Sequence, residues 1–325
     1  MVKIDLITGF LGSGKTTFIR QYAQWLIKKG YNIGILENDF GAVNVDMMLL
    51  QDLEGDNCEL EMVSGGCDKD CHRRRFKTKL IAMGMSGYDR VLVEPSGIYD
   101  VDEFFDALHE EPLDRWYEIG NVFAIVDAKL PQELSDAADY LLAAEAADAG
   151  AVLLSRAREA SAAEIDATVA HLNRALKKVG CSRQLDNEII RSNWFEFTDE
   201  DFERLMRAGY QMSDYCKAPQ QEEVFDSFFF MHVKMTEEEL LGAVHAVFAD
   251  RACGHIFRIK GFLPVGDGWL ELNATRRETL LKPISRGQEI LIVIGEGLSK
   301  EALQKYFQDS EAYPRYASSC YPLTE

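Results

Sequence analysis

Short apolar runs alternate with amphipathic stretches over the first 195 residues of the chain. Most of the runs are continuous and rich in β-branched residues, and only CELEMV alternates apolar with polar positions; they are residues 3–8, 32–39, 58–63, 90–95, 121–127 and 151–155. Helical patterns lie between them, at 16–29, 71–84, 104–109 and 132–149. Alternating strands and helices with continuous apolar strands predict an α/β fold, a mostly parallel sheet with helices on both faces.

The pattern changes after residue 195. A short acidic helix and a polar linker with Pro219 are expected in 196–222, which separate a domain at 1–195 from one at 223–325. The last part predicts strands, at 228–235 and then at 254–265, 268–274, 279–284 and 289–296, with helices after Thr236 and over 299–307. The spacing of Thr236 and Glu239 is that of a capping box. We expect a smaller C-terminal α+β domain.

The net charge and the composition of the chain disfavour some classes of binding partner. The formal net charge is −19, from 54 acidic and 35 basic residues, so nucleic acid and anionic membranes are disfavoured as general partners. No apolar stretch approaches the roughly 20 residues that span a bilayer. We therefore expect a cytoplasmic protein that binds neither nucleic acid nor membrane. The odd number of cysteines, 7, argues against a disulfide framework.

The segment GFLGSGKTT lies directly between the first strand and the first helix and satisfies the pattern G-x-x-x-x-G-K-[ST]. Glycines allow successive N–H groups to surround a phosphate, and the helix N-terminus adds favourable partial charge. Lys15 supplies a charge for the β- and γ-phosphates, and Thr16 a hydroxyl for Mg²⁺. The sequence thus predicts a P-loop nucleoside triphosphate site, formed by Gly9, Gly12, Ser13, Gly14, Lys15, Thr16 and Thr17.

A second element of this site follows the strand at 90–95. Glu94 stands at the end of the apolar run, and Gly97 comes three residues later. A carboxylate at a strand end can hold Mg²⁺, directly or through water, and the N–H of Gly97 can reach the γ-phosphate. A solvated strand-end glutamate is the alternative, but the apolar strand before Glu94 favours the Mg²⁺ site.

GFLGSGKTT near the start, then ENDFG, SGGC and E-x-S-G, resemble the CobW-like GTPases, and the resemblance covers nearly the whole chain. It implies a chaperone or insertion protein that binds and slowly hydrolyses GTP, handles a metal ion or metallocofactor, and serves a client metalloprotein, with a homodimer left open. It also implies that Asp39 and Asp46 belong to a first switch segment, Asp39 with a catalytic role and Asp46 as a Mg²⁺ ligand. Ala42 stands where the family has an acidic residue, so a group that would bind the metal ion or position a water molecule is absent.

The family's Cys-x-Cys-Cys metal motif is altered in this chain. Only Cys67 falls in place, because Lys69 and Asp70 replace the other two cysteines and Cys71 comes one residue late. Cys67, Cys71, His72 and Cys58 are nevertheless candidate ligands for Zn²⁺ or another transition metal, since thiolates and imidazole suit such ions. A redox-active pair and solvated cysteines without a role are the alternatives.

The base-reading motif is altered as well. Where GTPases have Asn-Lys-x-Asp, this chain has Ser155-Arg156-Ala157-Arg158 after the strand at 151–155. Arg156 can still cover the base with its guanidinium plane. Arg158 has donors only and cannot replace the carboxylate that accepts from guanine. We predict reduced guanine selectivity, with three outcomes open: selectivity is lost, another loop supplies the acceptor, or the nucleotide is ATP.

Two other classes of function remain open. One is a P-loop small-molecule kinase, although the sequence offers no arginine-rich lid segment. The other is a non-catalytic regulatory protein that has kept a nucleotide site. The leading hypothesis is a P-loop NTPase that acts as a nucleotide-dependent metal or metallocofactor chaperone, with GTP or ATP, Mg²⁺ and possibly Zn²⁺ as cofactors.

Overall fold

The computed structural model describes residues 1–39, 45–63, 69–99, 101–217, 224–266, 268–307 and 310–314. The chain forms two compact units. The first comprises residues 1–39, 49–63 and 73–222, and the second residues 40–48, 64–72 and 223–325. Of the described residues early in the chain, 45–48 and 69–72 thus belong with the C-terminal residues, which the sequence pattern does not predict.

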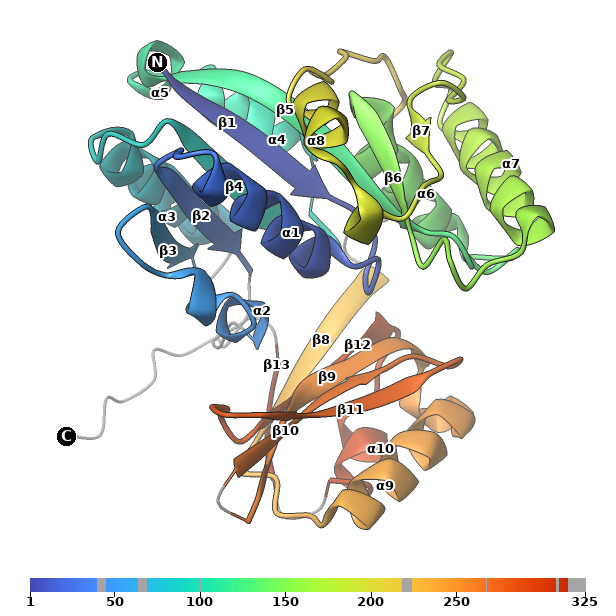
Figure 1. The fold of residues 1–325 in the computed structure, drawn as a ribbon. Coiled ribbons are helices and arrows are strands. Elements are labelled where there is room, and N and C mark those ends of the chain that lie inside the picture. Colours follow the sequence, from blue (N-terminus) through green and yellow to red (C-terminus); the bar gives the residue numbers. More distant parts are fainter. Residues whose placement is uncertain are drawn as a thin grey trace. The chain divides into compact units, whose positions relative to one another are not determined.

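The first unit is built on a seven-stranded sheet in which every strand pair is parallel (Figure 1). The spatial order is β3-β2-β4-β1-β5-β6-β7. The strands are β1 (Val2–Thr8), β2 (Ile33–Asn38), β3 (Cys58–Val63), β4 (Arg90–Pro95), β5 (Tyr117–Asp127), β6 (Ala151–Ser155) and β7 (Ile189–Ile190). Because β1 lies between β4 and β5, the chain reverses its direction of growth beside β1, which is where open α/β sheets bind ligands.

Helices cover both faces of this sheet, with α1 and α8 on one and α3, α4 and α6 on the other (Figure 1). The helices are α1 (Lys15–Lys28), α3 (Lys69–Gly84), α4 (Val101–Leu108), α5 (Leu113–Trp116), α6 (Asp136–Ala147), α7 (Ala162–Lys178) and α8 (Asp199–Leu205), with 3-10 turns η1 (Gln51–Leu53) and η2 (Trp194–Glu196). Helix α8 packs against α1 through the stacked rings of Trp25 and Phe202, 5.3 Å apart.

One buried ion pair fastens the centre of this sheet. Asp5 of β1 is fully buried and accepts from Arg90 Nη1 at 2.5 Å and from the backbone N–H of Asn121 at 2.8 Å. Burial raises the pKa of Asp5, while the charge of Arg90 and the hydrogen bonds act against that rise. The carboxylate thus ties β1 to β4 and β5, because each contributes a partner; a buried charge is tolerated only when it is paired in this way.

The second unit contains a six-stranded antiparallel sheet in the order β11-β10-β9-β12-β8-β13. Its elements are α2 (Val45–Met48), β8 (Phe225–Met231), α9 (Glu237–Ala249), η4 (Arg251–Cys253), β9 (His255–Val265), β10 (Gly268–Ala274), β11 (Thr279–Ile284), β12 (Ile290–Glu296), α10 (Lys300–Gln304) and β13 (Glu311–Pro314). Helices α9 and α10 cover one face, where Leu240, Val244 and Leu303 pack into an apolar core with the sheet.

The predicted fold class is confirmed: a parallel sheet with helices on both faces, and a smaller α+β unit. The capping box of Thr236 and Glu239 is present at the start of α9. The predicted strand at 228–235 is displaced, since β8 runs from Phe225 to Met231. It ends there because His232 adopts a left-handed φ of 56°, which an extended strand cannot contain.

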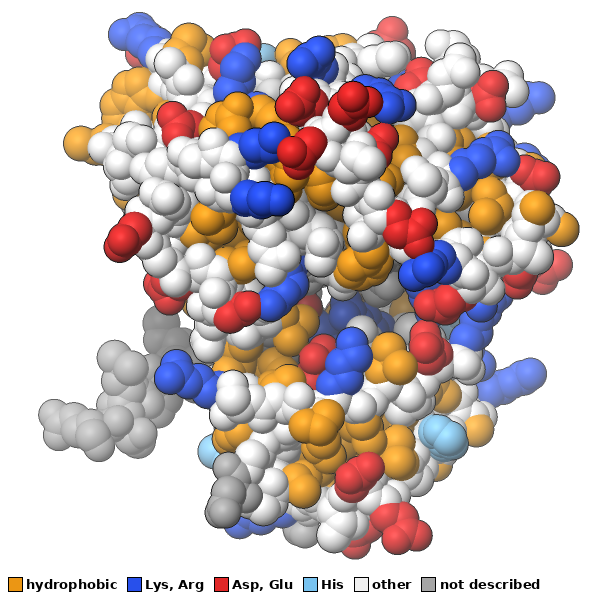
Figure 2. Space-filling model, in the orientation of Figure 1, with side chains coloured by type: hydrophobic (Ala, Val, Ile, Leu, Met, Phe, Trp, Pro, Cys, Tyr) orange, Lys and Arg blue, Asp and Glu red, His pale blue; other side chains and the backbone are white. Residues whose placement is uncertain are grey.

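The surface carries both signs of charge. On the face drawn in Figure 2, Lys and Arg side chains are interspersed with Asp and Glu side chains. Exposed ion pairs of the first unit include Lys29–Asp199 at 2.9 Å and Arg191–Asp166 at 2.7 Å. Within the described ranges, no helix is both long and apolar enough to cross a membrane.

Candidate nucleotide-binding site

The loop between β1 and α1 has the geometry that its glycines predict. Gly9, Gly12 and Gly14 have φ values of 145°, 75° and 99°, which other residues adopt only with strain. A Cβ at Gly9 would lie 2.3 Å from the carbonyl oxygen of Ile125. Lys15 is 7% exposed, and its Nζ donates to the carbonyl of Gly9 at 2.8 Å. The loop therefore folds back on itself, with its lysine held inside the turn.

Two hydroxyl groups at this loop lack a partner. The Oγ of Ser13 and the Oγ1 of Thr8 are buried and make no hydrogen bond within the described residues. Burying a hydroxyl without a partner is unfavourable, and a phosphate oxygen is the kind of acceptor that would satisfy Ser13. These orphaned groups, together with the glycine conformations, fit a loop built around an anion.

Two of the three predicted Mg²⁺ ligands, Thr16 and Glu94, come together beside this loop. Thr16 Oγ1 donates to Glu94 Oε1 at 2.8 Å, although the two residues lie on α1 and β4. Glu94 is 4% exposed, and its neighbour across the β2–β4 pair is Glu37, which is 3% exposed. A hydroxyl and a carboxylate in contact are the oxygen ligands that Mg²⁺ prefers. Thr16 and Glu94 therefore fit this ion.

The end of β2 carries a buried residue, Asn38, to which the sequence analysis assigned no role. Asn38 is 1% exposed, and neither its amide nitrogen nor its amide oxygen makes a hydrogen bond within the described residues. It lies beside Pro95 in the strand pairing, just after Glu94. Its signal in the sequence was its place in ENDFG, one of the motifs that carry the family resemblance, directly before Asp39. Asp39 follows β2 and donates its backbone N–H to Val63 at 3.1 Å.

Gly97 lies directly against the phosphate loop. A Cβ at this position would stand 2.8 Å from the backbone nitrogen of Leu11 and 3.0 Å from its Cα. Backbone atoms cannot yield as a flexible side chain can, so only glycine permits this approach. The structure thus brings Gly97 to the loop, as its predicted contact with a γ-phosphate requires.

Asp46, predicted as a Mg²⁺ ligand, makes a different contact. It lies on α2 in the second unit, and its Oδ2 accepts from Lys260 Nζ of β9 at 2.5 Å. Lys260 is 5% exposed, so the pair is largely buried. Asp46 is here the counter-ion of a buried lysine, and its role toward Mg²⁺ stays a prediction.

On the other side of β1, the strands β5, β6 and β7 end in polar segments. Arg156 follows β6 with a left-handed φ of 53°. Its guanidinium forms two hydrogen bonds with Asp127 at the end of β5, one of them from Nε at 3.2 Å. Asp127 also accepts from the backbone N–H of Lys129 at 2.9 Å. Arg156 thus ties two strand ends together, and its predicted place over a base stays a prediction.

Arg158 points to a carboxylate that the sequence alone does not connect with it. Its Nη2 lies 2.8 Å from Glu196 Oε1, at the end of η2. The same turn carries Trp194, which is 4% exposed and packs edge-on against Phe18 of α1. The ring of Trp194 is 3.9 Å from where a Cβ of Gly14 would stand. The turn after β7 therefore packs against the phosphate loop, a connection without a local sequence signal.

The candidate transition-metal ligands are only partly described. Cys67 lies outside the described residues, while Cys71 and His72 lie in the first turn of α3, with His72 1% exposed. Cys58 begins β3 and is buried. Burial, and secondly the charge of Glu54, raises the pKa of Cys58 to about 11, which disfavours its thiolate form. The role of Cys58 as a third metal ligand stays a prediction.

Among the residues that the structure describes, no group of three His, Cys, Asp or Glu side chains is arranged to hold a metal ion.

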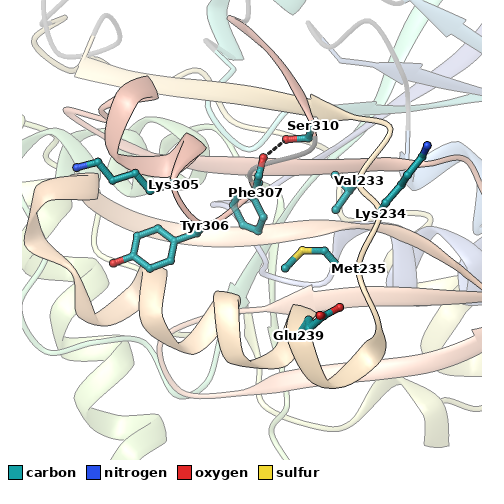
Figure 3. A pocket seen from close by; sticks show the side chains of 8 residues that line it. All are labelled: Val233, Lys234, Met235, Glu239, Lys305, Tyr306, Phe307 and Ser310. Carbon is teal, nitrogen blue, oxygen red and sulfur yellow. Dashed lines mark hydrogen bonds between the residues drawn. The ribbon is translucent and has the colours of Figure 1, made fainter.

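The second unit has a small pocket, shown in Figure 3, at the start of α9 and the end of α10; its lining residues are Val233, Lys234, Met235, Glu239, Lys305, Tyr306, Phe307 and Ser310. None of these was a predicted site residue.

A glycine-shaped loop between β1 and α1, with a buried lysine and a threonine joined to a strand-end glutamate, defines a P-loop nucleotide-binding protein. Within this class, residues 3–184 match the family model described as "CobW/HypB/UreG, nucleotide-binding domain". The match covers more than half of the 325 residues. The chain belongs to this family, which confirms the resemblance found in the sequence.

Two curated relatives come from Escherichia coli K12. The chain is 31% identical over 137 residues to "Zinc chaperone YjiA", covering 39% of this chain and 41% of that protein. It is 33% identical over 133 residues to "Zinc chaperone YeiR", covering 40% and 39%. The chain thus spans about two fifths of the length of the relatives it matches. Among solved structures, Zn(II)-bound YjiA GTPase from E. coli aligns at 17% identity and a TM-score of 0.31, covering 94% of this chain and 98% of that one.

Proposed function

We propose that this protein is a nucleotide-dependent chaperone that binds a transition metal, Zn²⁺ first, and passes it or a metallocofactor to a client metalloprotein. The observation that carries the proposal is the contact between Thr16 and Glu94, 2.8 Å apart beside the phosphate loop. Family membership and the names of the two E. coli relatives support the metal part of the proposal.

The phosphate chain of a nucleoside triphosphate would be held mainly by the loop. On binding, Lys15 exchanges the carbonyl of Gly9 for phosphate oxygens, and the Oγ of Ser13 gains an acceptor. Thr16 and Glu94 would hold Mg²⁺, which supplies neutralisation of the charge on the phosphates. Gly97, in contact with Leu11, is placed to detect the γ-phosphate through its backbone N–H.

Hydrolysis is expected to be slow. Residues 9–17, 37–39 and 94–99 contain neither a glutamine to orient water nor an arginine to stabilise the transition state. Without such groups, turnover in P-loop GTPases is on the order of 10⁻³ s⁻¹. A client or partner that supplies the missing group would raise this rate, which would link hydrolysis to delivery.

The metal site is proposed for the segment 64–72. Cys67, Cys71 and His72 are its candidate ligands, because thiolate and imidazole together suit Zn²⁺. The described part of this segment, residues 69–72, and α2 both belong to the unit formed by the C-terminal residues. Asp46 of α2 is bound to Lys260 of β9, so a change in the first switch segment would be felt by the C-terminal sheet. Through this link, nucleotide binding would control the affinity of the segment 64–72 for the metal ion.

The phosphate site is tested by calorimetry with GTP, ATP and their diphosphates, with and without Mg²⁺. Thr16→Val should abolish the Mg²⁺ dependence of triphosphate binding, whereas Thr78→Val, on exposed α3 positions, should leave it unchanged. Equal Mg²⁺ dependence in wild type and Thr16→Val would disprove the assigned ligand set.

The metal part is tested by competition for Zn²⁺ with a chromogenic chelator. We expect one tightly bound ion, lost in Cys67→Ser and weakened in Cys71→Ser, with Cys216→Ser, at an exposed cysteine, as control. No binding by wild type, with or without nucleotide, would reject the chaperone. In that case γ-phosphate transfer to a small molecule would identify a kinase, and absence of any turnover a regulatory protein.

A further inference from the structure

The sheet order separates the two ends of a bound nucleotide. Thr16 and Glu94 lie where β1 meets β4, and Asp39 follows β2, so the Mg²⁺ side of the site is the β4–β2 side. The phosphates occupy the loop after β1. The base and sugar must then lie toward the ends of β5, β6 and β7, because they extend away from the γ-phosphate.

Asp127 and Glu196 are carboxylates at this side, and they differ in how many hydrogen bonds they already accept. Asp127 has a 16% exposed side chain and accepts from Arg156 twice and from the backbone of Lys129. Its oxygens are engaged in holding β5 to β6. Glu196 has a 59% exposed side chain, and its contact with Arg158 is made through Oε1. The carboxylate of Glu196 can accept further hydrogen bonds, since an ionised carboxylate offers about four acceptor sites.

The backbone that carries Glu196 is held firmly. Trp194 packs against Phe18 with ring centroids 5.7 Å apart and approaches Gly14 of the phosphate loop. The turn is closed by hydrogen bonds from the backbone N–H groups of Phe195 and Glu196 to Asn193. Glu196 therefore stands on a turn fixed to the loop that binds the phosphates, and Arg158 orients its side chain.

The same turn holds a donor that lacks an acceptor. The Nδ2 of Asn193 is buried and makes no hydrogen bond within the described residues. An unsatisfied buried donor is costly, and a carbonyl oxygen on a bound ligand is one group that would satisfy it. Guanine has a carbonyl at the position where adenine has an amino group, so the orphaned donor favours guanine.

We propose that Glu196, oriented by Arg158, is the carboxylate that reads the base and makes the site selective for guanine. The inference rests on the proposed nucleotide-binding function. Guanine presents its N1–H and 2-amino group side by side, and a carboxylate accepts from both. Adenine presents an amino group beside an N1 lone pair, which a carboxylate repels. Arg158 stands where GTPases have the base-reading aspartate and cannot itself accept, but it positions Glu196, which can. Of the three outcomes left open by the sequence, this favours an acceptor supplied by another loop.

The test compares the affinities of GTP, ATP and xanthosine triphosphate for wild type, Glu196→Gln and the control Glu203→Gln, at an exposed position on α8. Wild type should bind GTP roughly a hundredfold tighter than ATP. Glu196→Gln should lose most of this preference, with ATP affinity unchanged. It should gain affinity for xanthosine triphosphate, because the glutamine amide donates to the 2-oxo group of xanthine. Glu203→Gln should behave as wild type.

A second variant tests the positioning role. Arg158→Met should lower the GTP preference by about tenfold, with ATP affinity unchanged, because the guanidinium no longer holds the Glu196 carboxylate in position. If wild type binds GTP and ATP alike, or if Glu196→Gln keeps the wild-type preference, the inference fails while the phosphate site stands. If wild type binds no nucleotide, the proposed function fails with it.

Discussion

The phosphate end and the base end of the site are built in different ways. The phosphate end comes from nine consecutive residues, Gly9–Thr17, and from Glu94, which Thr16 contacts at 2.8 Å. The proposed base end comes from the ends of β5 and β6 and from the turn η2 after β7, joined by ion pairs of Arg156 with Asp127 and of Arg158 with Glu196. The phosphate end is encoded by a local sequence motif, whereas the proposed base end forms only when the strands of the sheet come together.

This difference has a chemical reason. All nucleoside triphosphates share the same phosphate chain, so one loop of backbone N–H groups and a lysine suits them all. The bases differ in their donors and acceptors, so the groups that read them can be exchanged without loss of phosphate binding. The base-reading motif can therefore change while GFLGSGKTT is kept, as this chain illustrates.

The largest effect is expected at the phosphate end. Lys15→Ala removes the charge that faces the β- and γ-phosphates, and should lower the affinity for GTP and ATP by about a hundredfold or more, to the same degree for both. Isothermal calorimetry measures this, with Lys28→Ala at the exposed end of α1 as control. A change in the GTP-to-ATP ratio would show that the two ends are not independent.

A smaller effect is expected for Gly97→Ala. The added Cβ would stand 2.8 Å from the backbone nitrogen of Leu11, so the second switch must move away from the loop. Discrimination between triphosphate and diphosphate should fall by about tenfold, while diphosphate affinity stays constant, because only the γ-phosphate contact is lost. Gly55→Ala, where a Cβ meets nothing within 4 Å, is the matched control. Equal weakening of both nucleotides would contradict this role.

At the base end, Arg156→Met should have a still smaller effect. It breaks the pair with Asp127 that joins β5 to β6, and should reduce the affinity for GTP and ATP by about fivefold each, since a partly exposed ion pair contributes roughly 1 kcal/mol. Its GTP-to-ATP ratio should remain that of wild type, unlike the ratio of Glu196→Gln. Arg204→Met, on an exposed part of α8, provides the comparison. A changed ratio would assign base reading to Arg156.

The smallest expected effect on nucleotide binding, which is none, belongs to a variant that changes only the stability of the fold. Burial, aided by the charge of Asp102, raises the pKa of Asp148 from 3.8 to about 6, against the hydrogen bond from Ser213 N–H. The folded protein holds this proton more tightly than the unfolded chain, so wild type loses stability as pH rises from about 4 through 6. Asp148→Asn keeps an acceptor without the charge.

This variant should be more stable than wild type by up to about 3 kcal/mol at pH 8 and equal to it below pH 4. Urea unfolding at the two pH values measures the difference, and Asp114→Asn at an exposed position should show none. Nucleotide affinity should not change. If Asp148→Asn were more stable than wild type at pH 4 but not at pH 8, the raised pKa of Asp148 would be contradicted.

Much of the fold follows from the sequence because its signals are local. Continuous apolar runs gave β1, β4 and β6 nearly to the residue, and the Thr236–Glu239 box gave the start of α9. The strand predicted at 228–235 was misplaced, because hydrophobicity continues beyond Met231 while the left-handed backbone of His232 ends the strand. The strand predicted at 121–127 begins four residues earlier, at Tyr117.

The sequence by itself determined the phosphate loop, since glycines, lysine and threonine act within nine consecutive residues whose backbone they shape. Only the tertiary structure decided that Asp46 would meet Lys260 and that Arg158 would meet Glu196. These contacts join residues far apart in the chain, and any of the many surface carboxylates could have satisfied each cation. Charge alone does not select a partner; the order of strands in the sheets does.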